Sequence, residues 1–329
     1  MERLVDSYQR TITYLRLSLT DRCNLRCQYC MPPEGLDWIP ADNLMQDDEI
    51  VTILRDVFLP LGVTKVRLTG GEPTLRKGLP ALVERIAALP GLTDLSMTTN
   101  GIFLSKLAGP LAQAGLKRIN ISVDSLDPER FGSITRGGDL SKVLKGIEAS
   151  LAAGLSPVKL NAVLIPGTND DEVLAFAALT REMPVHVRFI EMMQVGDRSF
   201  FEEKGFVPIQ AMIDQIRDRY GIEASDAAVE GNGPAKVMRI PGAAGTLGFI
   251  SPMSQNFCHA CNRLRLTADG QIKACLMRPQ EQDLLGQLRA GTDPAILRET
   301  VRNALGIKPL HHEWGADEPI LRTMSRIGG

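Results

Sequence analysis

The sequence predicts an α/β protein whose first part is a partial (β/α)6 barrel and whose C-terminal part is a smaller domain. Short β-rich runs alternate with longer amphipathic runs over the first two-thirds of the chain, which is typical of a parallel sheet with crossover helices. The predicted strands end in residues able to do chemistry, and active sites of parallel barrels lie at that end. Six units favour a partial barrel over a complete one. We place the barrel at residues 1–230 and the second domain at 231–329.

The elements of the barrel follow from the spacing of apolar residues. In the first predicted helix, Ile50, Ile53, Leu54 and Val57 recur at helical spacing, and Gly62 ends it. The predicted strands are 14–20, 63–69, 93–98, 118–123, 158–165 and 185–190. The predicted helices are 46–61, 79–89, 105–114, 141–153 and 170–181.

The last third of the chain changes character. A predicted helix at 208–217 precedes a polar stretch at 223–234, which is typical of a linker. Two strands are expected at 235–240 and 246–250, and residues 263–272 indicate a hairpin with an Asp-Gly turn. That hairpin would return Cys275 to the vicinity of Cys258 and Cys261.

Composition and charge exclude several classes of protein. The chain has 329 residues, 44% hydrophobic and 23% charged, which is close to the average for soluble globular proteins. The net charge of -2 argues against a general nucleic-acid or anionic-membrane binder. The start does not resemble a secretory signal, and no uncharged stretch approaches membrane-spanning length. Clustered cysteines without an export signal indicate metal in a reducing compartment, so we expect a cytoplasmic protein.

Cys23, Cys27 and Cys30 form the first cysteine group, just after the first predicted strand. Three thiols leave a tetrahedral zinc shell incomplete, because structural zinc sites take four protein ligands. A 4Fe-4S cluster also has four corners, so three cysteines leave one iron open to a small molecule. A structural metal knuckle or a disulfide is the alternative.

Basic side chains alternate with apolar ones along several predicted strands. If the apolar faces pack on the helices, the basic residues project into the barrel, where they would suit a polyphosphate. The alternative is that they lie on solvated faces or pair with carboxylates, because a strand is easily misassigned by one residue. The residues concerned are Arg16, Lys65, Arg67, Lys159 and Arg188.

Cys258, Cys261 and Cys275 form a second cysteine group. A zinc site that adds His259 as the fourth ligand is compatible with this spacing. Ligands as close in sequence as Cys258 and His259 are sterically awkward, which favours iron and sulfur. On spacing alone both readings stay open.

The CxxxCxxC spacing of the first group, with Tyr29 before the last cysteine, resembles the signature of radical S-adenosylmethionine (SAM) enzymes. In that superfamily the open iron chelates SAM, whose reductive cleavage yields a 5'-deoxyadenosyl radical. Gly70-Gly71-Glu72-Pro73 on its own indicates no more than a turn. One strand after such a cysteine group, it matches the turn that contacts the SAM amine. The resemblance places Tyr29, Gly70, Gly71, Glu72, Ser122 and Met193 at SAM-binding positions.

The stretch from Asn256 to Leu276 resembles the second-cluster motif of the GTP 3',8-cyclase family of molybdenum cofactor biosynthesis. The stretches 14–23, 122–126, 158–161 and 188–191 and the terminal Gly328-Gly329 extend the resemblance over nearly the full chain. It implies two 4Fe-4S clusters, of which the second holds the guanine of GTP. The positions it implies for GTP are Arg16, Arg67, Thr98, Lys159, Arg263, Leu264 and Arg265, with Lys65 and Arg188 as helpers. Catalytic importance is implied for Arg16, Arg67, Arg263, Arg265, Gly328 and Gly329.

The resemblance also implies a reaction and partners. The adenosyl radical would take hydrogen from the ribose C3' of GTP, and the carbon radical would add to C8 of guanine. Reduction of the resulting base radical by one electron and its protonation would give (8S)-3',8-cyclo-7,8-dihydroguanosine 5'-triphosphate, which passes to cyclic pyranopterin monophosphate synthase. An electron donor such as flavodoxin is expected and a homodimer is possible; no nucleic-acid or membrane partner is expected.

Two other functions are considered. A peptide-modifying radical SAM maturase should carry more cysteines near its C-terminus, and a zinc-bound interaction protein would ignore SAM. Two positions depart from the family: Gln9 stands where it commonly has glycine, and Pro166 replaces a frequently basic residue. We assign no role to His311 and His312.

Overall fold

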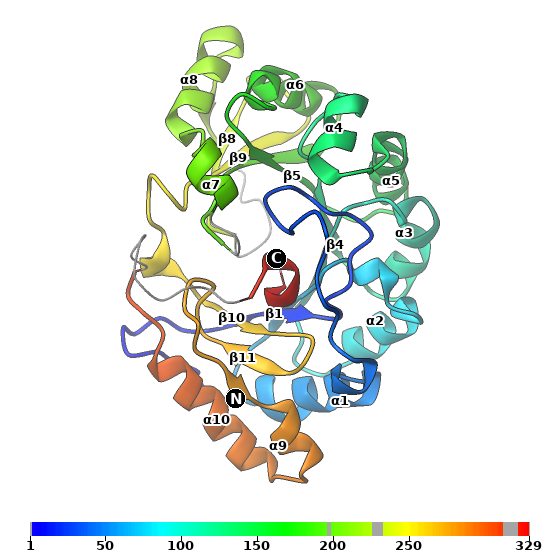
Figure 1. Cartoon of the computed structure of the whole chain (residues 1–329), viewed down its shortest axis with the longest axis vertical. Helices are drawn as coiled ribbons and strands as arrows, with labels where there is room; N and C mark the ends of the chain where they lie inside the picture. The colour runs from blue at the N-terminus through cyan, green and yellow to red at the C-terminus, as the bar shows by residue number, and fades with distance from the viewer. Residues whose placement is uncertain (1, 196–198, 226–232, 312–321, 329) are drawn as a thin grey trace.

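The computed structural model describes residues 2–195, 199–225, 233–311 and 322–328. Within these ranges one 12-stranded sheet runs in the order β12-β11-β10-β1-β2-β3-β4-β5-β6-β9-β8-β7. The strands β10, β1 to β6 and β9 pair in parallel, which confirms the predicted α/β class. The helices lie around the outside of the curved sheet, and the C-terminus lies at its centre (Figure 1).

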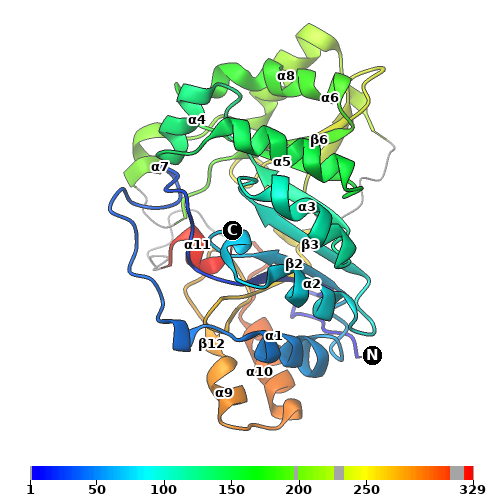
Figure 2. The same cartoon turned by 90° about the vertical axis from the view of Figure 1, so that its right-hand side faces the viewer.

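The six central strands are close to their predicted positions. They are β1 (Tyr14–Ser18), β2 (Lys65–Thr69), β3 (Asp94–Thr99), β4 (Arg118–Ser122), β5 (Val158–Leu164) and β6 (Val185–Glu191). The helices that follow them are α1 (Asp47–Ile53), α2 (Leu79–Ala87), α3 (Leu104–Gln113), α4 (Pro128–Thr135), α5 (Leu140–Ala152) and α6 (Val173–Glu182). The row of α2, α3, α5 and α6 on one face of the sheet is seen from the side in Figure 2.

The apolar faces of these elements form one core. Leu15, Leu17, Val66 and Leu68 are buried between the sheet and the helices. Because side chains alternate across a strand, the residues between them face the inside of the barrel. This confirms the assignment of the strand faces on which the predicted basic lining depends.

Helix α4 lies where the sequence pattern predicts no helix. It has only a short apolar face, but its start carries a cap that the sequence does reveal: the Asp127 carboxylate accepts a hydrogen bond from the backbone N–H of Arg130 at 2.8 Å, and Pro128 occupies the first turn. The predicted helix at 46–61 is also divided, since α1 continues as a π-helical turn at Leu54–Phe58.

The C-terminal elements extend the same sheet at both edges. Beyond β6 lie α7 (Ser199–Lys204), α8 (Ile209–Tyr220), β7 (Glu223–Ala224), β8 (Lys236–Arg239) and β9 (Thr246–Ile250). Beyond β1 lie β10 (Arg263–Leu266), β11 (Gln271–Lys273) and β12 (Gln282–Asp283), covered by α9 (Leu285–Arg289) and α10 (Pro294–Gly306). The antiparallel pairing of β10 with β11 confirms the predicted hairpin. The division into domains at residue 230 stays a prediction.

A turn near the N-terminus reaches the second cysteine group. The Asp6 carboxylate pairs with Arg10 at 2.5 Å, and both side chains are buried. Arg10 donates to the backbone carbonyl of Cys258 at 2.7 Å and to that of Pro309 at 2.8 Å. Gln9, between these groups, has a φ of 64°, which is the left-handed conformation that favours glycine.

Replacing Gln9 with Gly should stabilise the chain. A side chain in the left-handed region costs roughly 1 to 2 kcal/mol, and the greater freedom of glycine in the unfolded chain offsets part of that gain. We expect the free energy of unfolding to rise by about 1 kcal/mol, measured as a higher urea midpoint with an unchanged slope. Gln9→Ala keeps the left-handed strain and should show no such gain. A lower midpoint for Gln9→Gly would contradict the prediction.

Candidate active site

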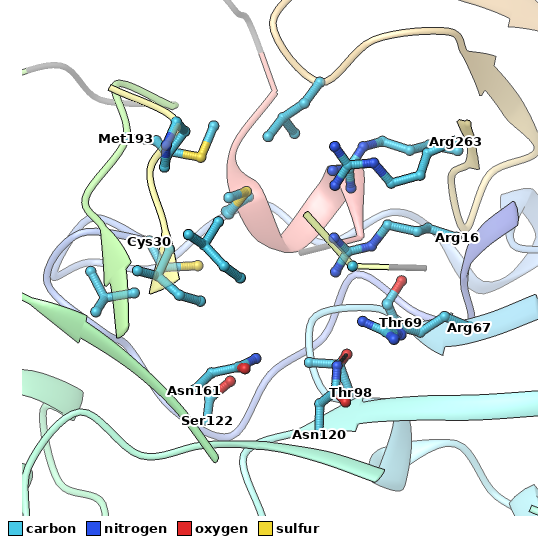
Figure 3. Close-up of a pocket in the computed structure, with 18 of the residues that line it drawn as sticks. Arg16, Cys30, Arg67, Thr69, Thr98, Asn120, Ser122, Asn161, Met193 and Arg263 are labelled. Atoms are coloured by element: carbon cyan, nitrogen blue, oxygen red, sulfur yellow. Dashed lines mark hydrogen bonds between the residues drawn. The ribbon is translucent and has the colours of Figure 1, made fainter. Parts of the chain in front are cut away.

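A cavity of about 340 Å³ lies inside the barrel, and both cysteine groups open into it. Cys23, Cys27 and Cys30 come from the loop after β1, and Cys258, Cys261 and Cys275 from the loops around β10 and β11. Figure 3 shows Arg16, Arg67 and Arg263 on one side of the cavity and Cys30 and Met193 on the other. The fold thus brings together two sets of thiols that are far apart in sequence.

The thiols of the first group lie in surroundings that oppose their ionisation. Burial raises the pKa of Cys23 to about 11 and that of Cys30 to about 12. Burial also raises the pKa of Cys27, and Asp124 and the other two thiols add to the shift. All three thiols line one cavity, and bound iron would supply the positive charge that deprotonates a buried thiol outright. The donor set therefore fits an iron-sulfur cluster.

In the second group, Cys261 lies in surroundings that favour its ionisation. Burial alone would raise the pKa of Cys261, but Arg263 and Lys308 outweigh burial and lower it to about 6. A zinc ion requires ligands at roughly 2.0 to 2.3 Å from one point. Among the described residues, no group of three or more His, Cys, Asp or Glu side chains is placed to hold one metal ion. The same is true of the first cysteine group, so this observation does not separate a zinc site with His259 from an iron-sulfur site, and both stay predictions.

Arginines from three neighbouring strands lie side by side. In the strand register Arg16 of β1 is opposite Arg67 of β2 and opposite Arg265 of β10. Burial and the neighbouring Arg263 lower the pKa of Arg265 to about 10, and burial with Arg67 lowers that of Arg188 to about 9. Like charges directly opposite on neighbouring strands destabilise a sheet. An anion in the cavity would remove that cost.

Two unpaired nitrogen atoms support the same conclusion. The Nε atoms of Arg16 and Arg188 are buried and have no hydrogen-bond partner among the described residues. Buried donors are rarely left unsatisfied, and guanidinium groups bind phosphate and carboxylate oxygens particularly well. Both arginines line the cavity. The cavity is therefore suited to a polyanionic ligand.

The turn after β2 is fixed by its own chain. Gly71 lies so close to the backbone carbonyls of Asp21 and Arg22 that a Cβ would clash with both. The buried Glu72 carboxylate accepts hydrogen bonds from the Thr99 hydroxyl at 2.6 Å and from the Asn100 N–H at 2.7 Å. These contacts tie the turn beside the first cysteine group to the end of β3.

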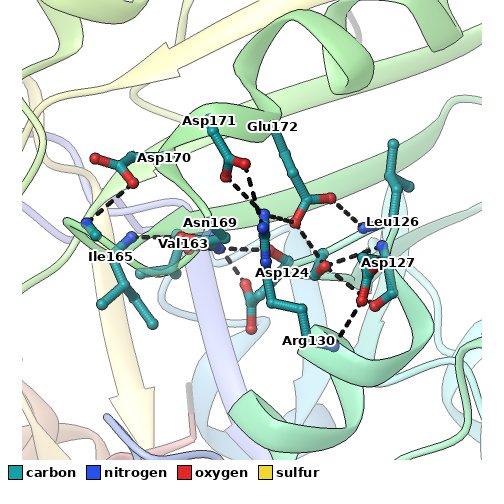
Figure 4. Close-up of polar contacts among 12 residues, drawn as sticks. Asp124, Leu126, Asp127, Arg130, Val163, Ile165, Asn169, Asp170, Asp171 and Glu172 are labelled. Atoms are coloured by element: carbon teal, nitrogen blue, oxygen red, sulfur yellow. Dashed lines mark hydrogen bonds and ion pairs between the residues drawn. The ribbon is translucent and has the colours of Figure 1, made fainter.

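A second polar network positions Tyr29. The Tyr29 hydroxyl donates to the Asp124 carboxylate at 2.7 Å, and the Val163 N–H donates to its other oxygen at 2.9 Å. Asn169 in turn donates to the backbone carbonyls of Asp124 and Val163, which joins the ends of β4 and β5 (Figure 4). Burial raises the pKa of Asp124 to about 6. The ring of Tyr29 is therefore held against the cavity by a buried acceptor.

The C-terminal segment enters the barrel. Helix α11 (Met324–Ile327) contributes Met324 and Ser325 to the cavity wall. The carbonyl of Gly328 accepts a hydrogen bond from Arg265 at 3.0 Å. Gly328 has a φ of 82°, and a Cβ there would lie 2.6 Å from the Thr69 hydroxyl. The position therefore requires glycine; Gly329 lies outside the described residues.

Comparison with known proteins identifies the family. A model described as "Radical SAM superfamily" matches residues 17–180, and one described as "Molybdenum Cofactor Synthesis C" matches 185–314. The GTP 3',8-cyclase of Pelotomaculum thermopropionicum is 47% identical over 98% of this chain and 99% of its own. That of Trichormus variabilis is 51% identical over 97% and 99%. The chain belongs to the GTP 3',8-cyclase family.

Members of this family are radical SAM enzymes, so the chain is an enzyme of that superfamily, which uses SAM and a 4Fe-4S cluster. A solved structure supports the fold: Streptococcus suis SuiB bound to S-adenosylmethionine covers 90% of this chain, and this chain covers 69% of SuiB, with a TM-score of 0.59 at 15% identity. No helix of the described residues is long and apolar enough to cross a membrane.

Most of the positions that the resemblance to GTP 3',8-cyclases indicates do line the cavity. They are Arg16, Tyr29, Arg67, Gly70, Gly71, Glu72, Thr98, Ser122, Arg188, Met193, Arg263 and Arg265, with the six cysteines. Lys65, Lys159 and Leu264 do not line it. Lys159 is buried, and Leu264 packs in the hydrophobic core. The roles of all these residues stay predictions.

The sequence analysis did not predict several residues that line the cavity. Asn120 shares the inward face of β4 with Ser122, so strand alternation could have found it. Tyr14, whose ring lies under the Arg67 guanidinium at 5.4 Å, could have been found in the same way. Lys308 also lines the cavity, but its place depends on the path of the chain after α10, and the local sequence carries no signal for it.

His186 should make the stability of the ligand-free chain depend on pH. The ring is buried and forms a 2.6 Å hydrogen bond with Thr246, while burial and the nearby Arg188 and Lys159 lower its pKa to about 2. An unfolded histidine titrates near pH 6.5, so between these values the unfolded chain binds the extra proton and stability falls as pH decreases. The slope from this group is about 1.4 kcal/mol per pH unit.

His186→Gln removes this contribution. Chemical unfolding at several pH values should show a shallower loss of stability in the variant, and the difference should reach about 2 kcal/mol on going from about pH 6.5 to pH 5. Parallel curves for the parent and the variant would contradict the prediction.

Proposed function

We propose that this chain is a GTP 3',8-cyclase that converts GTP to (8S)-3',8-cyclo-7,8-dihydroguanosine 5'-triphosphate, the first step of molybdenum cofactor biosynthesis. The observation that carries the proposal is that both cysteine groups open into one cavity, with Arg16, Arg67 and Arg265 aligned across neighbouring strands beside it. The cluster and SAM, when bound, supply a 5'-deoxyadenosyl radical, which can take the unactivated ribose C3' hydrogen that no ordinary base can remove.

The residues near the first cysteine group bind and orient SAM in this proposal. Tyr29 is fixed by Asp124, and the Gly70-Gly71-Glu72 turn is fixed by Thr99 and Asn100, so the surfaces offered to SAM are rigid before it binds. Ser122 and Met193 complete the set from the ends of β4 and β6. Rigid positioning matters because the radical has to form next to the C3' hydrogen.

The basic residues hold GTP in this proposal. Arg16, Arg67, Arg188 and Arg265 supply guanidinium groups for phosphate, and the unpartnered Nε atoms of Arg16 and Arg188 offer donors. Lys65 and Lys159 lie near the N-terminal ends of β2 and β5 and do not line the cavity, so their assignment to GTP rests on the resemblance alone. Thr98, Arg263 and Leu264 complete the positions assigned to GTP. Gly328, whose carbonyl accepts a hydrogen bond from Arg265, is assigned to the same site together with Gly329.

We propose a second 4Fe-4S cluster at Cys258, Cys261 and Cys275. Its support is that all three thiols line the cavity and that Arg263 and Lys308 stabilise the Cys261 thiolate, the form that binds iron. With only three thiols, the cluster would leave one iron open to the guanine ring. An electron donor such as flavodoxin, transfer of the product to cyclic pyranopterin monophosphate synthase, a possible homodimer and a cytoplasmic location belong to the same proposal.

An anaerobic assay tests the proposal directly. The reconstituted chain, incubated with GTP, SAM and dithionite, should release 5'-deoxyadenosine together with the cyclised nucleotide, both measured by chromatography and mass spectrometry. GTP that carries deuterium at C3' should transfer it to 5'-deoxyadenosine. Release of 5'-deoxyadenosine without deuterium and without a change in GTP would overturn the proposal.

A further inference from the structure

Lys308 is a buried cation beside the second cysteine group. Lys308 is 4% exposed and lies just after α10. Its ammonium group donates to the carbonyl of Arg263 at 2.8 Å and to that of Ala274 at 2.7 Å. Arg263 and Ala274 lie two residues and one residue from Cys261 and Cys275, so one side chain joins the two segments that carry these thiols.

The charge of Lys308 has no carboxylate partner within the described part of the chain. An ammonium group has three donors, of which two are used by these carbonyls. The two carbonyls belong to residues two positions after Cys261 and one position before Cys275, so the ammonium group lies against the segments that carry both thiols. A buried charge without a partner is costly, so an anion is expected next to it. The thiolates of the proposed second cluster are that anion.

Lys273 offers a useful contrast. It is also buried, on β11, in the strand that leads to Cys275. Its ammonium group, however, pairs with the Glu281 carboxylate at 3.1 Å and donates to the carbonyl of Arg278 at 2.8 Å. Lys273 therefore has its own carboxylate counter-ion, and Lys308 has none among the described residues.

We propose that Lys308 is a positioning residue for the second cysteine group: it holds the Cys261 and Cys275 segments together and serves as the counter-ion of their thiolates. The inference rests on the proposed second cluster. Reduction of a cluster adds a negative charge, which a nearby cation stabilises. Lys308 therefore raises the reduction potential of that cluster.

The test uses the full chain with Cys23, Cys27 and Cys30 replaced by Ala, so that iron can enter only the second site. Iron and sulfide analysis of this parent should give about four irons per chain. A parent that binds no iron would refute the second cluster itself, which separates failure of the proposed function from failure of this inference.

Lys308→Gln, Lys308→Arg and Lys273→Met are then compared on that parent. Gln can still donate to the two carbonyls but carries no charge, so the cluster should load in Lys308→Gln and be harder to reduce. At a fixed poise the ratio of reduced to oxidised cluster should fall about tenfold, which corresponds to 59 mV for one electron. Redox titration followed by electron paramagnetic resonance measures this ratio. Lys308→Arg should restore the parental potential, and Lys273→Met should leave it unchanged.

Each outcome decides the matter. A cluster that is absent from Lys308→Gln but loads in Lys308→Arg also supports the inference, because arginine keeps the positive charge and glutamine does not. A parental potential in Lys308→Gln would overturn it. Equal failure of Lys308→Gln and Lys308→Arg to load iron, with normal loading in Lys273→Met, would also overturn it, because the shape of lysine and not its charge would then matter.

Discussion

Replacing Cys27 with Ala should abolish the release of 5'-deoxyadenosine and, with it, all conversion of GTP. Cys27 lies between Cys23 and Cys30 in one loop, and all three thiols face the same cavity. Removing one ligand of three leaves the cluster with two, whereas losing a residue that merely supports a ligand already costs about 10- to 100-fold. We therefore expect a loss greater than about 100-fold, measured under anaerobic conditions with SAM, dithionite and GTP.

The matched control is Gln28→Ala. Gln28 is the next residue in the loop, and its amide donates to the carbonyl of Ser133 at 3.0 Å. It carries no thiol, so the variant should bind iron and release 5'-deoxyadenosine at close to the parental rate. A Cys27→Ala protein that released 5'-deoxyadenosine as the parent does would show that this group does not hold the cluster.

Replacing Cys258 with Ala should separate the two halves of the reaction. The first cysteine group is unchanged, so the variant should still cleave SAM, but GTP cyclisation should fall by more than about 100-fold because the second site loses a ligand. The iron content should decrease from about eight to about four per chain. Paired measurements of 5'-deoxyadenosine, cyclised nucleotide and iron on one preparation would show the separation.

His259→Ala serves as the control for this second experiment. The side chain is adjacent to Cys258 but is exposed. It is a ligand in a Cys3His zinc site and not in the iron-sulfur site, so its replacement should leave iron and cyclisation unchanged. Normal cyclisation by Cys258→Ala would show that the second site is wrongly assigned, and loss of metal in His259→Ala would favour zinc.

The spacing of apolar residues along the chain was sufficient to predict the central part of the fold. Alternating and helical spacing predicted all six central strands, because each of them is buried on its helix-facing side and carries the pattern of that burial. The spacing of the cysteines and the basic residues between apolar ones also predicted much of the cavity wall. Helix α4 was not predicted because a helix of about two turns gives only a weak periodic pattern. The pair Asp127-Pro128 does mark its start.

Other features depend on pairing that no local pattern contains. The alignment of Arg67, Arg16 and Arg265 exists because β10 pairs with β1, and this partner choice is a property of the whole sheet. Lys308 owes its position to the path of the chain after α10, and the place of Gly328 was known only through resemblance. Gln9 differs from these examples because the sequence did indicate its position. It stands where the family commonly has glycine, and its left-handed conformation strains the turn.

The pairing of β1 with β10 also affects how the chain is synthesised. Thr13 and Asn262 are hydrogen-bonded at 3.2 Å although they are 249 residues apart. At about 5 to 20 residues per second, a ribosome completes β1 roughly 10 to 50 s before the strand that covers its outer edge. During that interval the nascent chain presents unpaired backbone groups to other chains, which favours aggregation. Fragments that stop before Asn262 should therefore sediment as aggregates, and chaperones that shield nascent chains should improve the yield of the full-length protein.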